Sequence, residues 1–275
     1  MKTKNLILMF LLIIIASNFL GCEYVHIDYN LKYSELIEKK ITMNKKKLIN
    51  IKNTNGFVKV STHDKDYTVI SAKKFSNKKS NLSLIKIKFD LREEGLYIYT
   101  KASKKHLNFK VNYTVLIPKR LEKLEVSSTN SLIKANGEFN DVELSTTNGA
   151  IQANGNFSNV IFSTTNGAIK LYGIFNKTNL KTTNGSIKII QNNIINNNMN
   201  IFTSNGSVKL QLNKDSNFRI KGRTTNGKIS CDFPVKITKK ITRSKINGEV
   251  GQGKYLINLS TTNGNIKITE SPVKK

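Results

Sequence analysis

The sequence is short of several residue types that carry chemistry or constrain a fold. Its 275 residues include two cysteines, three histidines, three prolines and no tryptophan. None of the histidines has a cysteine, an aspartate or a second histidine at ligand spacing, so no metal site is predicted. If Cys22 is acylated, Cys231 has no partner and no disulfide can form. Cys231 stands at an apolar position of a repeat, which predicts a small buried side chain.

Acidic residues are also scarce. The chain has 18 Asp and Glu residues against 45 Lys and Arg residues, and its formal net charge is +27 at pH 7. Such an excess favours anionic partners, for example lipid head groups, nucleic acid or acidic polysaccharide. The alternative is that the charge is compositional, because the chain is crowded with Lys, Asn and Ile, as expected from an adenine–thymine-rich genome.

Residues 1–21 have the pattern of a signal peptide. Lys2 and Lys4 precede an apolar run at residues 6–15, which is too short to span a bilayer. The following Gly21-Cys22 resembles the end of a lipobox. Cys22 is therefore the predicted lipidation site, and the protein is expected to be exported and anchored to a membrane. The alternatives are ordinary secretion with an unmodified Cys22 and an uncleaved anchor.

The chain does contain an iterated phrase, Thr-Thr-Asn-Gly, with near copies. The Asn of successive copies stands at positions 130, 148, 166, 184, 205, 226, 247 and 263. A period near 20 residues is typical of a repeat architecture. Six Asn-Gly pairs are the predicted corner residues, and their stacked Asn side chains are expected to form a ladder. These residues are Asn148, Gly149, Asn166, Gly167, Asn184, Gly185, Asn205, Gly206, Asn226, Gly227, Asn263 and Gly264.

Aligning the copies on this Asn reveals columns. Three places after the Asn every copy has Ile or Val, and five places after it most copies have an apolar residue. The position between them is mostly polar. This alternation is typical of a half-buried strand, so each repeat is predicted to be strand, Asn-Gly corner, strand and second turn. Glycine is expected at the corner because it permits a positive φ.

Two all-β folds are compatible with the repeat. Asn-Gly between alternating strands is a hairpin signal, which permits an antiparallel β-meander. We favour a parallel β-helix, or β-solenoid, because it stacks each position about 4.8 Å from its copy in the next coil and so rewards identical columns. The solenoid is assigned to residues 126–275, and the alternating segments of 46–125 to its first coils and an amino-terminal β cap. The coil around Asn247 breaks the columns and is expected to be the loosest.

Residues 22–45 are polar and are expected to be a lipid-anchored tether, with one helical turn near residues 34–40. The repeats that follow resemble those of the bacterial putative-adhesin family of unknown function, whose members carry iterated S/T-x-N-G-x-I/V coils. Asn53-Thr54-Asn55-Gly56 is an early copy, and the likeness covers roughly residues 46–270. The resemblance implies a solenoid, and it implies no reaction, cofactor or catalytic residue.

The repeats offer no constellation for catalysis. The seven acidic residues between positions 126 and 275 do not share one column of neighbouring coils, so paired carboxylates for acid–base catalysis or calcium are not predicted. The Ser and Thr hydroxyls have no base nearby, and each Asn-Gly leads into a strand rather than into a phosphate-binding helix. We therefore predict that the chain is not an enzyme and has no catalytic residue, metal or cofactor.

One column suggests a ligand. Lys170, Lys188 and Lys209 stand on consecutive coils, in a segment (170–275) with 19 basic and four acidic residues. Stacked ammonium groups repel, so a polyanion would relieve the repulsion. The alternative is that these long side chains spread into solvent. No aromatic residue interleaves with the column, so specific nucleic-acid binding is not predicted.

The predicted partners are an anionic polymer, an anionic lipid or a host-surface ligand, and the repeats do not indicate an oligomeric state. Three functions follow. The first is an adhesin-like lipoprotein of the cell envelope that binds a polymeric or surface ligand. The second is a structural or regulatory envelope protein that contacts anionic membrane or cell-wall polymer. The third and least favoured is an exported glycan-active enzyme, because solenoids can carry such sites.

Overall fold

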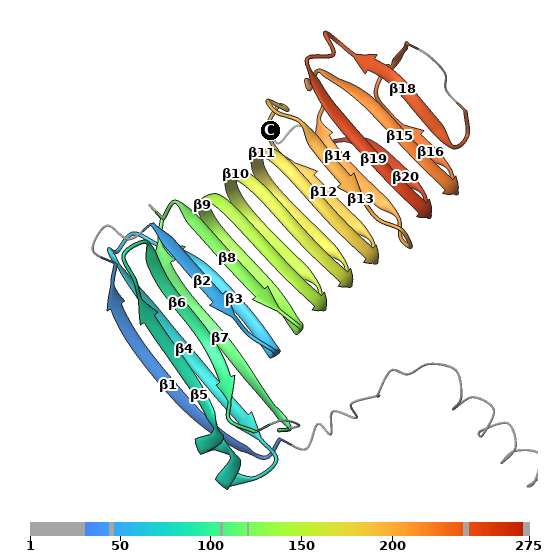
Figure 1. Ribbon diagram of the computed structural model, residues 1–275. Coiled ribbons are helices and arrows are strands. Elements are labelled where there is room, and N and C mark those ends of the chain that lie inside the picture. The colour runs from blue at the N-terminus through green and yellow to red at the C-terminus, as the bar shows by residue number, and fades with distance from the viewer. Residues whose placement is uncertain (1–30, 44–46, 105–106, 120, 239–241, 272–275) are drawn as a thin grey trace, which may run out of the picture. The chain divides into compact units, whose positions relative to one another are not determined.

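The computed structural model describes residues 31–43, 47–104, 107–119, 121–238 and 242–271 (Figure 1). In these ranges one short 3₁₀ helix, η1 (Lys79–Leu84), accompanies twenty strands. The repeats stack as parallel coils, so the solenoid prediction is confirmed and the antiparallel meander is excluded. No helix in the described part of the chain is long and apolar enough to cross a membrane.

Each coil contributes a strand to each of two faces. The first, called the lysine face, runs in the order β7 (Phe109–Pro118), β3 (Asn55–His63), the first parts of β9 (Asn130–Asn148), β10 (Ile151–Asn166) and β11 (Ile169–Asn184), then β12 (Ile187–Gln191), β14 (Val208–Asn213), β20 (Ile266–Ser271) and β16 (Ile229–Cys231). The opposite face runs in the order β6 (Gly95–Ala102), β2 (Leu48–Lys52), β8 (Lys123–Ser128), the second parts of β9, β10 and β11, then β13 (Met199–Phe202), β19 (Tyr255–Asn263) and β15 (Phe218–Asn226).

Strands β9, β10 and β11 pass through both faces because a bend, rather than a break, joins their halves. The bend falls at Gly137, Gly155 and Gly173, which lie in register with one another. Their φ angles are +128°, +146° and +126°, which other residues rarely adopt. The predicted second turn is therefore a bend within a single strand, which pairs with its neighbours on both sides of the bend.

The coils are not stacked in the order of the sequence. The β2–β3 coil lies between the β6–β7 coil and the β8–β9 coil, although it precedes both in the chain. At the other end, the β19–β20 coil lies between the β13–β14 coil and the β15–β16 coil. The sequence-ordered stack that the aligned copies predicted is therefore wrong at both ends.

Antiparallel strands cover the end of the stack that β6 and β7 form. β4 (Tyr67–Ser76) pairs with β7, and β1 (Tyr33–Thr42) pairs with β4. β5 (Ile85–Leu91) pairs with β6 on the opposite face. The tether predicted through residues 22–45, with a helical turn near 34–40, is wrong over the length of β1. The physical reason is that β1 satisfies a strand edge of β4 that would otherwise be unpaired.

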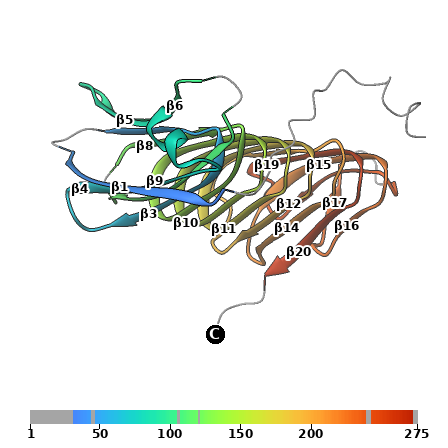
Figure 2. The same cartoon turned by 90° about the horizontal axis from the view of Figure 1, so that it is seen from below.

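The other end is covered by β18 (Lys245–Val250), which pairs antiparallel with β15, and by β17 (Lys236–Ile237), which pairs with β18. Asn247 consequently lies opposite Lys221 and outside the column of stacked Asn residues. The segment predicted as the loosest coil is not a coil, because it protects the edge of β15. Both views place β1, β4 and β5 at one end of the stack and β16 at the other (Figures 1 and 2).

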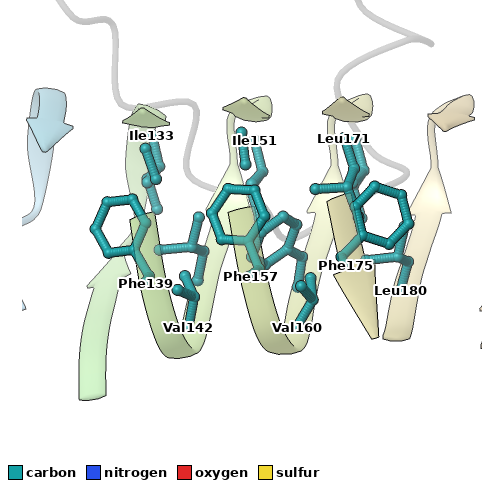
Figure 3. Close-up of a cluster of buried hydrophobic side chains, with 14 of the residues drawn as sticks. Ile133, Phe139, Val142, Ile151, Phe157, Val160, Leu171, Phe175 and Leu180 are labelled. Carbon is teal, nitrogen blue, oxygen red and sulfur yellow. The ribbon is translucent and has the colours of Figure 1, made fainter. Parts of the chain in front are cut away.

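Apolar columns fill the space between the two faces. Figure 3 shows side chains of three successive coils pointing into this space, with Phe139, Phe157 and Phe175 beside the bends. The rings of Phe139 and Phe157 are stacked, with centroids 5.6 Å apart. Ile169 and Ile187 are neighbours in register, and each is 0% exposed. Burial of such columns, at about 25 cal/mol per Å² of apolar surface, drives the stacking of coils.

Candidate ligand-binding surface

A ladder of eight Asn side chains runs along one corner of the stack. The amide nitrogen of every ladder Asn except Asn55 donates to the side-chain oxygen of the Asn in the neighbouring coil, with seven bonds of 2.7 to 2.9 Å. In spatial order the ladder is Asn55, Asn130, Asn148, Asn166, Asn184, Asn205, Asn263 and Asn226. All six Asn residues predicted at corners belong to it, in an order set by the exchanged coils.

The glycines that follow these Asn residues have a different role from the predicted one. Positive φ angles occur at Gly56, Gly137 and Gly155, among others, but at none of the six corner glycines. The corner glycines are required because the coils approach closely. A Cβ atom on Gly167 would lie 1.9 Å from the carbonyl oxygen of Gly149, and one on Gly185 would lie 1.9 Å from that of Gly167. The positive-φ explanation is therefore wrong for these positions.

Buried Thr hydroxyls complete the corner. Thr164 Oγ1 donates to the carbonyl oxygen of Gly149 at 2.9 Å, and Thr182 Oγ1 donates to that of Gly167 at 2.9 Å. The same bond links later coils, up to the bond from Thr224 to Gly264 at 2.8 Å. The coils from β9–β10 onward are thus tied to their neighbours by Asn bonds and Thr bonds in addition to the backbone ladder, which makes the faces a fixed platform.

The lysine face carries a row of cations that is longer than the predicted one. The register places Lys267 beside Lys209, because the β19–β20 coil is inserted there. It also places Lys59 beside Lys134, at the other end of the row. The complete lysine row is Lys59, Lys134, Gln152, Lys170, Lys188, Lys209 and Lys267. Lys59 was missed, although it stands four places after Asn55 and so occupies the same column of the repeat.

The lysine row is accessible, and the described residues provide it with no ion-pair partner. Lys170, Lys188, Lys209 and Lys267 are exposed. The ion pairs found between described residues include no member of the row. A shallow hollow of about 210 Å³ is bounded by Lys188, Lys209 and Lys267. Lys188 Nζ lies 5.7 Å from the centroid of the Tyr172 ring, so one aromatic side chain does lie beside the row.

A pair of carboxylates on the opposite face was not predicted, because Glu125 precedes the repeats. Glu125 and Glu143 are neighbours in register. Lys123 bonds to Glu125 and lies 3.7 Å from Glu143. The hydrogen bond from Lys123, helped by one from Asn50, holds the pKa of the Glu125 carboxyl below its ordinary value. A general acid needs a raised pKa, so this arrangement has the character of a structural ion cluster.

The remaining candidate residues are not drawn together. Cys22 lies outside the described residues. Cys231 is half-buried beside Ile268, where burial raises the pKa of its thiol. His63 Nε2 lies 2.7 Å from the carbonyl oxygen of Tyr67. Within the ranges that the structure describes, no group of three or more His, Cys, Asp or Glu residues could hold a metal ion.

Comparisons with known proteins identify a family and several similar solved structures. Residues 26–269 match the model of a family described as Toastrack DUF4097. A putative cell adhesion protein from Clostridium sporogenes has 13% identity and a TM-score of 0.39, over 87% of this chain and 100% of its own. A putative adhesin from Bacteroides fragilis has 9% identity and a TM-score of 0.44, over 85% of this chain and 97% of its own. No curated protein matches the chain.

Proposed function

The chain belongs to the Toastrack DUF4097 family, and we propose that it is a non-enzymatic, adhesin-like lipoprotein of the cell envelope whose lysine row binds a linear polyanion. The observation that carries the proposal is the run of Lys170, Lys188, Lys209 and Lys267 on four consecutive coils. Strand spacing repeats a positive charge about every 4.8 Å. An extended anionic polymer along the stack would contact several of these charges at once.

The surroundings of the row suit an extended ligand. On the side toward the Asn ladder the row is bordered by small side chains, including Ala150, Ala168, Ser186 and Ser207. They leave space for a polymer to lie against the lysine stems. Because the ladder fixes the coils, the ammonium groups are held at a regular spacing before binding, which reduces the entropy cost of association.

Neighbouring cations also provide a driving force. Like charges stacked on adjacent strands destabilise a sheet, and none of these four lysines has an ion pair within the described structure. An anion bound between two neighbouring lysines of the row replaces this repulsion by attraction. A ligand with one isolated charge gains little from the row, whereas each further charge of a polymer adds a contact.

Anchoring through Cys22 belongs to the proposal. Lipidation at this position would hold the coil stack at a membrane surface, where it meets polymers of the envelope or of another surface. Replacing Cys22 by Ala should abolish lipid labelling and release the protein into the soluble exported fraction. Retention of the Cys22→Ala variant at the membrane would contradict the lipid anchor.

Binding is tested by titrating the protein with heparin and with vesicles that contain anionic lipid. The variant Lys170→Gln/Lys188→Gln/Lys209→Gln is compared with Lys78→Gln/Lys79→Gln/Lys104→Gln, which removes the same charge from exposed positions outside the row. Equal losses in the two variants would contradict a specific row. Protease treatment of intact cells then separates the two envelope roles, because an adhesin is cleaved from outside and a periplasmic or wall-facing protein is protected.

A further inference from the structure

A second surface feature arises on the opposite face, where the coil order departs from the sequence order. Insertion of the β19–β20 coil places Ser260 between Phe202 and Arg223. On the far side of Arg223, the antiparallel β18 contributes Lys245. These four residues form one row across four strands, and they come from four separate parts of the chain.

The row encloses a hollow because its members differ in size. Ser260 is short, and it stands between the larger side chains of Phe202 and Arg223. The next row of the same face contributes Asn258 and Lys221, which are also neighbours in register. Together these residues line a depression of about 480 Å³, which is the size of a small-molecule site rather than of a polymer groove.

The hollow concentrates positive charge. Arg223 and Lys245 lie directly opposite each other in the β15–β18 pairing, and Lys221 is two residues from Arg223 on the same strand face. All three side chains are exposed. The described residues provide none of them with an ion pair. Opposed like charges are unfavourable across an antiparallel pair, so the site favours an anionic group between them.

The other residues that line the hollow indicate which class of molecule would carry the anionic group. Phe202 is half-buried and presents an apolar wall, while Asn258 and Ser260 offer amide and hydroxyl groups on the floor. A sugar ring combines an apolar face of C–H groups with a rim of hydroxyls, and a guanidinium binds carboxylate or sulfate through two parallel hydrogen bonds. We propose that this hollow binds a single acidic sugar residue, a uronate or a sulfated sugar, with its ring against Phe202 and its anionic group at Arg223 and Lys245.

The test uses the full chain and defined probes. Glucuronate and a sulfated disaccharide are titrated by calorimetry or by NMR, with glucose, inorganic sulfate and adenosine monophosphate as comparisons. Binding of the acidic sugars, with weaker binding of glucose and sulfate, supports the site. Equal affinity for sulfate alone would show a simple anion site. Tighter binding of the nucleotide would show a base-stacking site, and either result would overturn the proposal.

Variants connect the binding to this hollow. Arg223→Gln and Phe202→Ala should each weaken acidic-sugar binding on the order of tenfold, the change expected when one charged or stacked contact is lost. Ser260→Leu fills the floor without changing any charge, and it should also prevent binding. Circular dichroism confirms that each variant is folded. Unchanged binding in Ser260→Leu would overturn the proposal.

The site is independent of the lysine row, since the two lie on different faces. The Lys170→Gln/Lys188→Gln/Lys209→Gln variant should keep full affinity for the acidic monosaccharide. Loss of polymer binding in that variant with retention of sugar binding supports both assignments. Failure of the polymer experiment alone leaves the acidic-sugar result intact, so the two proposals are tested separately.

Discussion

Lys74 Nζ lies 3.0 Å from a carboxylate oxygen of Glu35, in the covering of the stack formed by β1 and β4. The same nitrogen donates to the carbonyl oxygen of Leu82 in η1, also at 3.0 Å. Only 5% of the Lys74 side chain is exposed, against 48% of the Glu35 side chain. Because a buried cation is costly without a partner, this contact joins β1, β4 and η1 energetically.

We therefore predict that Glu35→Gln lowers the free energy of unfolding by roughly 1–3 kcal/mol, because it leaves the Lys74 ammonium group buried without its counterion. Urea denaturation measures the change. Glu38→Gln is the matched control, since Glu38 is exposed on the same strand and forms none of the ion pairs seen among described residues. Equal losses in the two variants would show that the charge of β1 matters and the Lys74 contact does not.

The Asn ladder predicts an effect that depends on position. The Asn166 side chain bonds to those of Asn148 and Asn184, whereas the Asn226 side chain, at the end of the ladder, bonds to one ladder neighbour, Asn263. Asn166→Ala should cost about twice as much stability as Asn226→Ala, with about 1 kcal/mol for each hydrogen bond. Thermal melting of both variants measures the ratio.

Asn247→Ala provides the control for the ladder, because Asn247 lies in the covering strand β18 and outside the ladder. It should have a smaller effect than Asn166→Ala. If Asn247→Ala lost as much stability as Asn166→Ala, the hydrogen bonds between stacked Asn side chains would not be the cause of the loss.

The corner glycines predict a steric effect. In Gly167→Ala the added Cβ atom would meet the carbonyl oxygen of Gly149 at 1.9 Å, so the two coils must separate. We expect a loss of about 1–3 kcal/mol, the usual cost of overpacking, measured by urea denaturation. Gly222→Ala is a useful comparison, because its closest contact is a side-chain methyl group of Ile246 at 2.6 Å, which can shift more easily than backbone. Greater damage from Gly222→Ala would contradict the close-approach explanation.

The stacked fold could be predicted because each coil of a solenoid requires the same residue types at the same positions. Every coil of the Asn ladder needs an inward Ile or Val after the corner and an Asn at the corner, so the sequence displays the same columns that the register contains. The order of the coils could not be predicted for the same reason. The coils at Asn205, Asn226 and Asn263 present equivalent corners and equivalent apolar columns, and either order buries them. Their connections, including the β18 segment, decide which order is formed.

The sites depend on that order. Lys267 is next to Lys209, and Ser260 is next to Phe202, only because one coil is inserted between two others. The strand β1 was missed for another reason. It pairs with a single neighbour, and most of its side chains are exposed. Its sequence therefore shows no apolar alternation, and backbone hydrogen bonds to β4 define it.

The Glu125 cluster predicts how stability responds to acid. Its hydrogen bond to Lys123 lowers the pKa of the Glu125 carboxyl in the folded state. The unfolded chain then binds a proton more readily, so this contribution is present above the ordinary pKa of Glu, about 4.3, and is lost as the pH falls through the folded value. Glu125→Gln should lose less stability than the parent protein between neutral pH and pH 3. Urea midpoints across this range measure it, and parallel curves would contradict the prediction.

The lysine row predicts that the affinity for heparin depends on the salt concentration and on the number of lysines in the row. Each Lys→Gln change among Lys170, Lys188 and Lys209 should weaken heparin binding further, while Gln152 shows that glutamine is accommodated in the same row. The affinity of the parent protein should fall with added salt, because the Debye length shortens to about 8 Å at physiological ionic strength. The slope of the logarithm of affinity against the logarithm of salt concentration should become shallower with each lysine removed, since fewer ions are released on binding.

Two comparisons make this result specific to the row. Adding Lys267→Gln to the triple variant should reduce affinity again, because the structure places Lys267 beside Lys209, whereas the sequence order places it far away. Lys228→Gln removes the same charge from an exposed position of the carboxyl-terminal half that is not in the row, and it should have little effect. If Lys228→Gln and Lys267→Gln weaken binding equally, the net charge of the chain accounts for the affinity. A larger effect of Lys267→Gln requires the inserted coil and a continuous row.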